Sequence, residues 1–337
     1  MHKIHIENID GRAIAYDCAN GDTLLRSGLR AGVGFPYECN VGGCGNCRFQ
    51  LVEGEIATAW GEAPGLVPRD RRKGLKLGCQ SYPLSDCRIR LRLGPPSASL
   101  MRPTVHLARL AAQRELSPGM REFTFRTDGP ADFLPGQYAL LQLPGVDSVR
   151  AYSMSNLPNL SGCWQFIVRR VPGGEGTAVL FDSLKIGHSI EIDAPYGLAH
   201  YREQSSRDII CVAGGSGLAP MLSVARAASA RTDGRLWFYF GGRTPQDMCA
   251  EACLASIPGF RSRIRHVDAV SRPPVGASGW PGAVGFIHEV VDHQQGPELS
   301  AFEIYMAGPP PMLRAMLETA VLKHRVPVEQ IHYDRFF

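Results

Sequence analysis

The sequence carries little net charge, no long apolar run and no recognisable export signal. Its 36 Lys and Arg nearly balance its 32 Asp and Glu, which leaves a formal charge of +4. This balance argues against a nucleic-acid-binding protein. No apolar stretch reaches the roughly 18 residues that span a bilayer, and the N-terminus lacks the apolar core of a secretory signal. We therefore expect a cytoplasmic protein that binds neither nucleic acid nor membrane.

The composition is that of a globular protein with more than one domain. Hydrophobic residues make up 44% and charged residues 20% of the 337 residues, a length that suggests two or three domains. Residues 94–103, GPPSASLMRP, have the Pro, Gly and Ser content of a linker, and a weaker break lies at 203–207. We expect domains over 1–97, 103–204 and 207–337.

The three segments differ in their hydrophobic pattern. The first opens with the alternating Ile4 and Ile6 and continues into a short helix over 23–31. The middle segment consists of short runs separated by Pro-Gly and Gly-Gly turns, which suggests a small antiparallel barrel. The third alternates strands at 208–213, 236–240 and 302–306 with helices at 219–230 and 312–324. That alternation predicts a doubly wound α/β domain.

Four of the ten cysteines form a specific pattern. Cys39-x4-Cys44-x2-Cys47, followed at a distance by Cys79, is the spacing of plant-type [2Fe–2S] proteins. Four thiolates that converge on two irons need a tightly wrapped backbone, and the glycines at 42, 43 and 45 provide open conformations for it. The alternatives are a zinc site or four unrelated buried cysteines. Zinc knuckles use paired cysteines, whereas Cys79 stands alone.

The middle segment contains a candidate flavin motif. After an expected strand over 137–143 comes Arg150-Ala-Tyr152-Ser153, in which the Arg can neutralise a pyrophosphate and the aromatic ring can stack on a flat cofactor. Downstream, Gly174-Glu-Gly176-Thr177 would let a helix N-terminus approach phosphate. Taken alone, the four-residue match also fits a strand end with a surface Arg. Its place between a cluster segment and a nucleotide segment favours FAD.

The third segment carries two candidate nucleotide turns. Gly214-Gly215-Ser216-Gly217 follows a buried strand, where a dinucleotide can sit against a helix N-terminus. It matches neither the G-x-G-x-x-G fingerprint nor a P-loop. Ala307-Gly308-Pro309-Pro310 follows a later strand at the edge where ligands bind, although a merely rigid turn would have the same sequence.

These motifs together resemble the reductase components of multicomponent bacterial aromatic-ring oxygenases. The likeness is greatest to the reductases of carbazole dioxygenase and then of toluene monooxygenase, and it runs from end to end. It is carried by residues 35–47, 63–66, 150–153, 214–220, 307–310 and 331–337. It implies a β-grasp ferredoxin domain joined to a barrel that binds FAD and an α/β domain that binds NADH.

The resemblance also assigns site residues. Cys39, Cys44, Cys47 and Cys79 would hold the [2Fe–2S] cluster. FAD would contact Arg150, Ala151, Tyr152, Ser153, Ile167, Val168, Arg169, Gly174, Gly176, Thr177, Phe336 and Phe337, with Ser153 near flavin N5 and a terminal aromatic over the ring. NADH would contact Gly214, Gly215, Ser216, Gly217, Arg243, Asp247, Gly308, Pro309 and Pro310. Many members of this family have a Cys where this chain has Ala307, a departure that argues against a thiol role in hydride transfer, which the flavin can carry out without one.

The implied activity is the conversion of one electron pair into two single electrons. Electrons would pass from NADH to FAD, then to the cluster, then to a ferredoxin or terminal oxygenase, and no side chain is needed as general acid or base. Two alternatives are a stand-alone NADH reductase of quinone, flavin or ferric acceptors, and an iron–sulfur redox sensor. We expect a monomer that prefers NADH, since Arg243 is followed by Asp247 and no second base. A basic run over 69–76 is a candidate docking surface for the acceptor.

Overall fold

The computed structural model describes residues 1–8, 13–94, 101–230, 234–273 and 280–336, so most of the expected linker lies outside the described residues. The chain divides into two compact units. Unit 1 comprises Met1–Val105 with Asp193–Pro195, and unit 2 comprises His106–Ile192 with Tyr196–Phe337. Among the described residues no helix is both long and apolar enough to cross a membrane.

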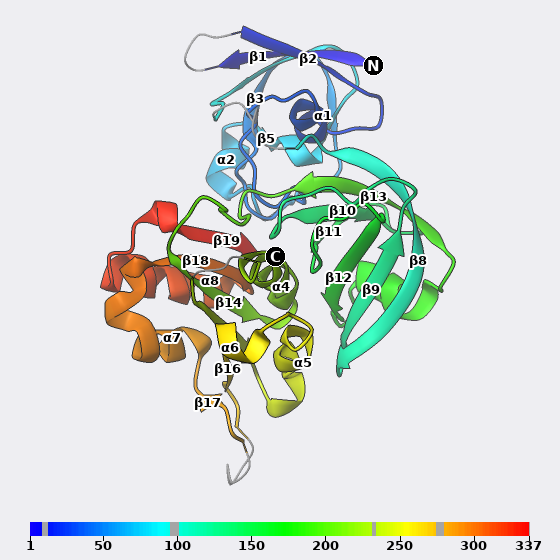
Figure 1. Cartoon of the computed structure of the whole chain (residues 1–337). Coiled ribbons are helices and arrows are strands. Elements are labelled where there is room, and N and C mark those ends of the chain that lie inside the picture. Colours follow the sequence, from blue (N-terminus) through cyan, green and yellow to red (C-terminus); the bar gives the residue numbers. More distant parts are fainter. Residues whose placement is uncertain (9–12, 95–100, 231–233, 274–279, 337) are drawn as a thin grey trace. The chain divides into compact units, whose positions relative to one another are not determined.

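Unit 1 has the mixed sheet and packed helix of a β-grasp fold (Figure 1). Its five-stranded sheet has the order β2-β1-β7-β3-β5, with β1 antiparallel to β2 and parallel to β7. The expected alternation is confirmed, because Ile4 and Ile6 are both fully buried. The elements are β1 (His2–Asn8), β2 (Ala13–Cys18), α1 (Leu24–Arg30), β3 (Arg48–Glu53), β4 (Ile56–Thr58), α2 (Pro68–Arg72), β5 (Leu75–Leu77), η1 (Gly78–Gln80), β6 (Ser81–Pro83) and β7 (Cys87–Leu91).

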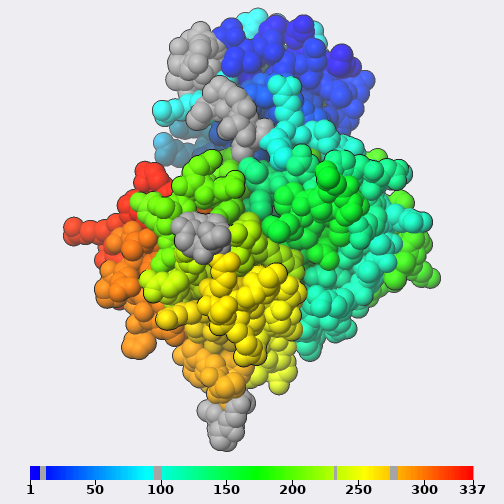
Figure 2. All heavy atoms as spheres, viewed as in Figure 1, coloured from blue at the N-terminus to red at the C-terminus, as the bar shows by residue number. Residues whose placement is uncertain are grey.

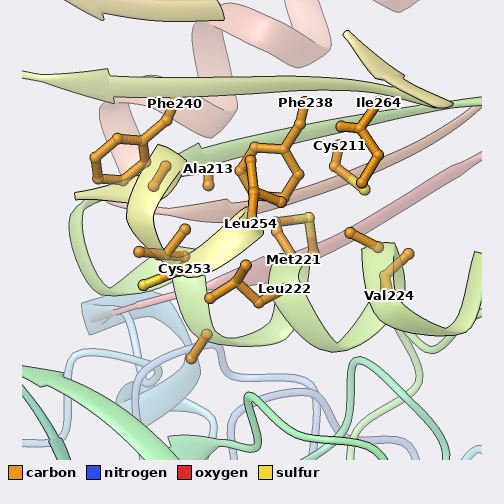
Figure 3. Close-up of a cluster of buried hydrophobic side chains, with 14 of the residues drawn as sticks. Cys211, Ala213, Met221, Leu222, Val224, Phe238, Phe240, Cys253, Leu254 and Ile264 are labelled. Atoms are coloured by element: carbon orange, nitrogen blue, oxygen red, sulfur yellow. The ribbon is translucent and has the colours of Figure 1, made fainter. Parts of the chain in front are cut away.

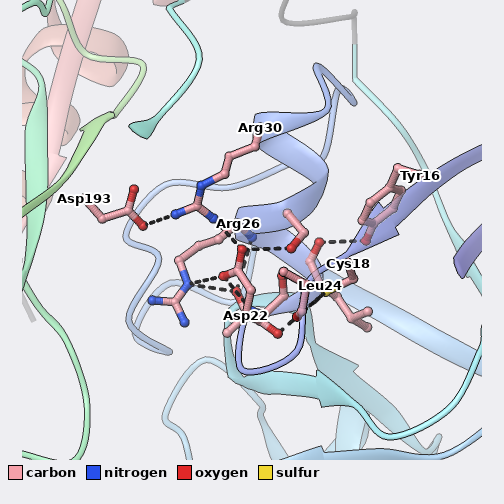
Figure 4. A network of polar contacts seen from close by, with 10 residues as sticks. Tyr16, Cys18, Asp22, Leu24, Arg26, Arg30 and Asp193 are labelled. Carbon is pink, nitrogen blue, oxygen red and sulfur yellow. Dashed lines mark hydrogen bonds and ion pairs between the residues drawn. The ribbon is translucent and has the colours of Figure 1, made fainter. Parts of the chain in front are cut away.

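A polar network fixes the start of helix α1 (Figure 4). Thr23 caps the helix, and its side chain accepts from the backbone N–H of Arg26 at 3.2 Å. The carboxylate of Asp22 binds the hydroxyl of Ser27 at 2.8 Å and the guanidinium of Arg26 at 3.1 Å. This network holds α1 against the sheet, and the loop that follows it contains the first three cysteines of the motif.

The first half of unit 2 is an antiparallel barrel. Its six strands follow the order β11-β10-β13-β8-β9-β12, and the bridge between Met154 and Phe166 brings the two ends of this sheet together. The expectation of a small antiparallel barrel is therefore confirmed. The elements are β8 (Thr104–Ser117), β9 (Met120–Arg126), β10 (Tyr138–Gln142), β11 (Arg150–Ser153), β12 (Cys163–Arg169), α3 (Glu175–Ala178), η2 (Val179–Ser183) and β13 (Ser189–Tyr196).

The second half of unit 2 is a doubly wound parallel sheet with the order β17-β16-β15-β14-β18-β19. Its strands are β14 (Asp208–Gly214), β15 (Leu236–Gly242), β16 (Ile264–Val270), β17 (Ala283–Val284), β18 (Phe302–Gly308) and β19 (Ile331–Arg335). The main helices are α4 (Leu218–Ala228), α5 (Ala250–Leu254), α6 (Phe260–Arg263), α7 (Ile287–Gln295) and α8 (Pro310–Leu317), and the short helices are η3 (Gly215–Gly217), η4 (Pro245–Asp247), η5 (Gly296–Ala301), η6 (Glu318–Lys323) and η7 (Val328–Gln330).

Two apolar cores cover the two faces of this sheet. On one face, Met221 and Leu222 of α4 and Leu254 of α5 pack with Phe238 and Cys211 of the sheet (Figure 3). On the other face, α7 and α8 pack against strand residues that alternate with the first set, such as Ile304 and Met306. Strand residues buried on both faces are typical of a parallel sheet, as the sequence predicted.

The barrel and the parallel sheet of unit 2 share a contact surface. The hydroxyl of Ser223 on α4 donates to the backbone oxygen of Asn156 at 2.7 Å, and Arg226 donates to the oxygen of Ser155 at 2.5 Å. Met120 and Ile167 of the barrel also belong to the core that contains α4. In Figure 2 the two parts accordingly form one continuous surface, cyan to green for the barrel and green through yellow to red for the sheet domain.

Two turns meet at the carboxyl edge of the parallel sheet. A Cβ atom built on Gly217 would lie 2.0 Å from the carbonyl oxygen of Ala307, and one on Gly308 would lie 3.0 Å from the oxygen of Gly214. The register supports this closeness, since Ala213 pairs with Ala307. The Gly214–Gly217 and Ala307–Pro310 turns therefore pack backbone against backbone, and a side chain at Gly217 cannot be accommodated.

We expect Gly217→Ala to lower the stability of unit 2 by about 1–3 kcal/mol, because the new methyl group overpacks a contact between two backbones. The measurement is the urea midpoint of the full-length protein followed by far-UV circular dichroism. Gly129→Ala is the matched control, since a Cβ there meets nothing within 4 Å. Equal midpoints for the two variants would show that the turns do not pack as described.

Candidate redox and nucleotide-binding sites

The four motif cysteines converge around one loop of unit 1. Cys39, Cys44 and Cys47 lie between α1 and β3, and Cys79 lies in η1. A Cβ on Gly42 would lie 3.4 Å from Cδ of Gln80, so the loop packs on the segment that contains Cys79. Three of the four cysteines are buried and Cys44 is half-buried. The fold thus brings together residues that are up to 40 positions apart.

The four thiols are arranged as two pairs. The hydrogen bond with the Cys44 side chain lowers the pKa of Cys39 to about 7, and the same contact raises the pKa of Cys44. The contact between Cys47 and Cys79 likewise raises the pKa of Cys47 and lowers the pKa of Cys79. In each pair the hydrogen bond between the thiols favours the thiolate form of one cysteine, and the thiolate is the form that binds metal.

Nitrogen donors surround the sulfurs. The backbone N–H of Cys44 points at Sγ of Cys39 at 3.3 Å, and that of Asn46 points at Sγ of Cys44 at 3.4 Å. The side-chain amide of Gln80 lies 3.6 Å from Sγ of Cys79. Hydrogen bonds of this kind stabilise thiolates and set the reduction potential of an iron–sulfur centre.

Backbone conformation explains the residues of the loop. Gly42 and Gly45 have φ of +87° and +79°, as predicted, but Gly43 does not have a positive φ, and Asn40 at +58° takes its place. Asn tolerates the left-handed region better than other side chains. A Cβ on Gly45 would lie 2.4 Å from the oxygen of Gly65, so residue 45 must be glycine for a second reason.

The donor set fits a binuclear cluster. The four thiols approach one another as two pairs, which matches two ligands for each of the two irons of a cluster. Both side-chain polar atoms of Asn40, which is 3% exposed, have no hydrogen-bond partner among the described residues. A buried amide normally has a partner, and the adjoining cluster is a group that could supply one.

The side chain of Arg150, in strand β11, lies against the short helix α3. A Cβ on Gly176 would lie 2.9 Å from Cγ of Arg150, so only glycine leaves room for the arginine. The guanidinium contacts Glu175 at 3.3 Å, an exposed pair that is weak enough to exchange for a phosphate. Thr177 holds the turn through its hydroxyl, which bonds the backbone N–H of Val171 at 3.2 Å. The two segments that were singled out for FAD are thus neighbours.

The remaining residues that were predicted to bind FAD differ in their burial and contacts. Burial raises the pKa of Tyr152 to about 12, against the effect of Arg150, so the phenol stays neutral and can stack on a ring. The side chain of Ile167 belongs to the apolar core, and Val168 is 2% exposed. The Arg169 guanidinium lies 2.8 Å from Asp247. Ala151 lies between Arg150 and Tyr152 in β11.

Ser153 has a partner that the sequence analysis missed. Its hydroxyl donates to Oδ2 of Asp334 at 3.2 Å, although the two residues are 181 positions apart. Ser153 is the last residue of β11 and Asp334 lies in β19, beside Ala307 in the register of the sheet. An acid–hydroxyl pair is therefore located where the barrel meets the carboxyl edge of the sheet.

The carboxyl edge carries the predicted nucleotide residues. Gly215 has a φ of +56°, and Ser216 lies between Gly215 and Gly217 in the short helix η3. Pro309 caps α8 and Pro310 opens it, as expected for proline in the first turn of a helix. These turns consist mostly of glycine and proline, and they lie at the edge where parallel sheets bind ligands.

The carboxylate of Asp247 already accepts several hydrogen bonds. Its Oδ2 accepts from the backbone N–H groups of Arg243 and Thr244 at 3.1 and 2.9 Å, and its Oδ1 accepts from Arg169. Burial acts to raise its pKa, but these donors outweigh burial and lower the pKa of the carboxyl. Asp247 therefore stays negatively charged beside Arg243, an arrangement that disfavours a second phosphate group.

Phe336 lies at the same edge. Its backbone N–H donates to the oxygen of Gly308 at 3.1 Å, and its ring packs against the core that contains α4. Phe337, the other predicted flavin cover, lies outside the described residues.

Three family models match consecutive parts of the chain. A 2Fe-2S iron-sulfur cluster binding domain matches residues 7–84, an oxidoreductase FAD-binding domain matches 107–201, and an oxidoreductase NAD-binding domain matches 211–318. The order of these domains confirms the predicted fold class and the predicted cofactors.

Relatives of known function cover the whole chain. The ferredoxin–NAD(P)(+) reductase CarAd of Metapseudomonas resinovorans is 41% identical, and the match covers 98% of each chain. The ferredoxin–NAD(+) reductase component of the alkene monooxygenase system of Xanthobacter autotrophicus is 39% identical over 97% of this chain and 98% of its own. A solved ferredoxin reductase in carbazole 1,9a-dioxygenase superposes with a TM-score of 0.90 at 37% identity, over 100% and 99% of the two chains. The chain belongs to the family of oxygenase-system reductases, in which one polypeptide joins a 2Fe-2S domain, an FAD-binding domain and an NAD-binding domain.

Proposed function

We propose that this chain takes electrons from NADH and delivers them singly, through FAD and a [2Fe–2S] cluster, to the ferredoxin or terminal oxygenase of an aromatic-ring-hydroxylating system. The observation that carries the proposal is the pairing of four motif thiols in the same chain as FAD- and NAD-binding domains. When bound, FAD accepts a hydride's electron pair and passes electrons on one at a time, and the cluster holds one electron.

The proposed ligands follow from the geometry of the two units. Cys39, Cys44, Cys47 and Cys79 would hold the cluster. In unit 2, Arg150 and the Gly174–Thr177 turn would bind the pyrophosphate of FAD, with Ser153 beside the reactive edge of the flavin and Phe336 over its face. The Gly214–Gly217 and Gly308–Pro310 turns would bind NADH, and the Asp247 charge beside Arg243 favours NADH over NADPH.

The boundaries and setting are part of the proposal. We assign the domains to residues 1–97, 103–204 and 207–337, and we expect a cytoplasmic monomer. All ten cysteines are free thiols, which suits the reducing compartment in which a thiolate-bound cluster is assembled.

Replacing Cys39 or Cys79 by Ser should remove or destabilise the cluster and leave FAD bound, because the two units have separate cores. NADH should still reduce ferricyanide at a rate near that of the unmodified protein, whereas reduction of cytochrome c, a one-electron protein acceptor, should fall at least about tenfold since the cluster supplies single electrons. The readouts are the cluster EPR signal, the flavin absorbance and the two rates.

Cys87→Ser is the matched control for the cysteine variants. Cys87 is a buried cysteine of the same unit, and it lies in β7 rather than on the loop. This control should keep the EPR signal and both rates. Loss of FAD together with the cluster in Cys39→Ser, or an unchanged cytochrome c rate without the cluster, would contradict the proposed electron path.

The basic run near the cluster loop has three cations without a partner. Arg69, Arg72 and Lys73 are exposed and form no ion pair within the described residues, whereas Arg71 is bound to Glu62 and donates to the oxygen of Ala63. Nearby, Trp60 is 47% exposed, and a Cβ on Gly42 of the loop would lie 3.2 Å from its Cε3 atom. Exposed cations and an exposed aromatic residue in the domain that carries the cluster motif suit an acidic protein surface.

The double variant Arg69→Glu/Arg72→Glu should therefore slow reduction of the purified acceptor protein severalfold at low salt and flatten its salt dependence, because surface charges mainly set the association rate. Stopped-flow absorbance at several salt concentrations measures both effects. The control Lys3→Glu/Arg92→Glu makes the same change in net charge away from this run. Identical rates and salt slopes for the two variants would exclude the docking role, and ferricyanide reduction should be unaffected in both.

A further inference from the structure

The side chain of Asn40 is a buried amide that directly follows the first cysteine of the loop. Asn40 is only 3% exposed, and neither its Nδ2 nor its Oδ1 atom has a hydrogen-bond partner among the described residues. Among those residues it is the one side chain with two buried polar atoms that lack a partner. Burying an amide in this way is unfavourable, so its presence in the fold requires an explanation.

The conformation of the backbone does not by itself explain an amide at residue 40. Asn40 has a φ of +58°, in the left-handed region that asparagine tolerates better than most residues. Gly42 and Gly45 of the same loop also have positive φ, and glycine adopts this region with no side chain to bury. Glycine at residue 40 would therefore satisfy the turn equally well, and the buried amide has a second cause.

Bulk water cannot be the partner of this amide, because both of its polar atoms are fully buried. The segment that follows β4 packs against the same loop. The backbone N–H of Gly65 donates to the oxygen of Gly42 at 2.9 Å, and a Cβ on Gly42 would lie 3.2 Å from the Trp60 ring. The partner must therefore come from the group that the four cysteines of this loop would hold.

A similar arrangement occurs at the fourth cysteine of the motif. Gln80 directly follows Cys79 and is 9% exposed, and its Nε2 atom lies 3.6 Å from Sγ of Cys79. Each of the two thiol pairs thus includes one cysteine that is followed by a buried amide side chain. An amide nitrogen donates hydrogen bonds, whereas the sulfur of a thiolate or a sulfide accepts them. The nitrogen of Asn40, rather than its oxygen, is therefore the atom suited to the cluster.

Resting on the proposed function, we propose that the side-chain amide of Asn40 donates a hydrogen bond to a sulfur atom of the bound [2Fe–2S] cluster and thereby raises its reduction potential. Reduction adds one negative charge to the cluster, and a donor aimed at sulfur stabilises the more negative state. Asn40 is not an iron ligand. Its role is to make the cluster a better acceptor for the single electrons that FAD releases.

The test is a redox titration of the protein loaded with FAD and the cluster. The EPR signal gives the potential of the cluster, and the flavin absorbance gives the potential of FAD in the same sample. Asn40→Gly removes the donor and keeps the positive φ, and Asn40→Asp replaces the amide by a carboxylate of the same shape. Gln50→Glu is the control, since it makes the same change from amide to carboxylate at an exposed residue of β3 in the same unit.

We expect the potential of the cluster to fall in both variants at residue 40. The expected shift in Asn40→Gly corresponds to about a tenfold change in the ratio of reduced to oxidised cluster, which is about 59 mV for one electron. The shift should be larger in Asn40→Asp because its carboxylate adds a buried negative charge. In Gln50→Glu the shift should be much smaller, since solvent screens an exposed charge. The potential of FAD should be the same in all variants.

A cluster potential in Asn40→Gly equal to that of the unmodified protein would overturn the proposal. A direct readout keeps the test decisive if the variants at residue 40 do not assemble a cluster. In unmodified protein labelled with nitrogen-15 in the side-chain amide of asparagine, pulsed EPR of the reduced cluster should detect a nitrogen-15 coupling.

This coupling should persist in Asn46→Ala, because the Asn46 side chain is exposed and donates to Glu38 at 3.3 Å. A cluster EPR signal without any nitrogen-15 coupling in the unmodified protein would contradict the hydrogen bond from Asn40. Absence of a cluster EPR signal from the unmodified protein would instead refute the proposed function.

Discussion

Contacts between backbones that exclude side chains are the constraint on which both halves of this protein depend. In unit 1 a methyl group on Gly45 would strike the oxygen of Gly65 at 2.4 Å, and in unit 2 one on Gly217 would strike the oxygen of Ala307 at 2.0 Å. The first contact closes the loop that aims amide groups at sulfur. The second brings two turns together at the edge of the parallel sheet, where a dinucleotide can approach the backbone.

Around these contacts the side chains supply charge and hydrogen-bonding groups. The thiol pairs of unit 1 can carry the negative charge that iron requires, and nitrogen donors balance that charge. In unit 2 the flavin site that we propose is lined by Arg150, by neutral Tyr152 and by the Ser153–Asp334 pair. This division of labour matches the chemistry, because the cofactors carry the electrons and the protein binds and orients the cofactors.

The sequence predicted what depends on local spacing and missed what depends on packing. The cysteine pattern, the three domain types and the Ile4/Ile6 alternation can be recognised from the spacing of residues along the sequence. Asp334 was missed because its partner lies 181 residues away and nothing in its neighbourhood marks it. Gly43 was assigned an open conformation that Asn40 adopts instead, and the ion pair of Arg71 with Glu62 depends on how the loop folds back. The helix expected over 312–324 begins at Pro310, and its final turns from Glu318 to Lys323 widen into a π-helix.

The central claim is that one chain joins a two-electron carrier to a one-electron carrier, and an anaerobic titration with NADH tests it most directly. The protein loaded with FAD and the cluster should take up three electrons, so about one and a half equivalents of NADH should complete the reduction. The flavin absorbance should bleach as the EPR signal of the reduced cluster grows. Completion at about one equivalent, with no EPR signal from the cluster, would contradict the account because the cluster would lie outside the electron path.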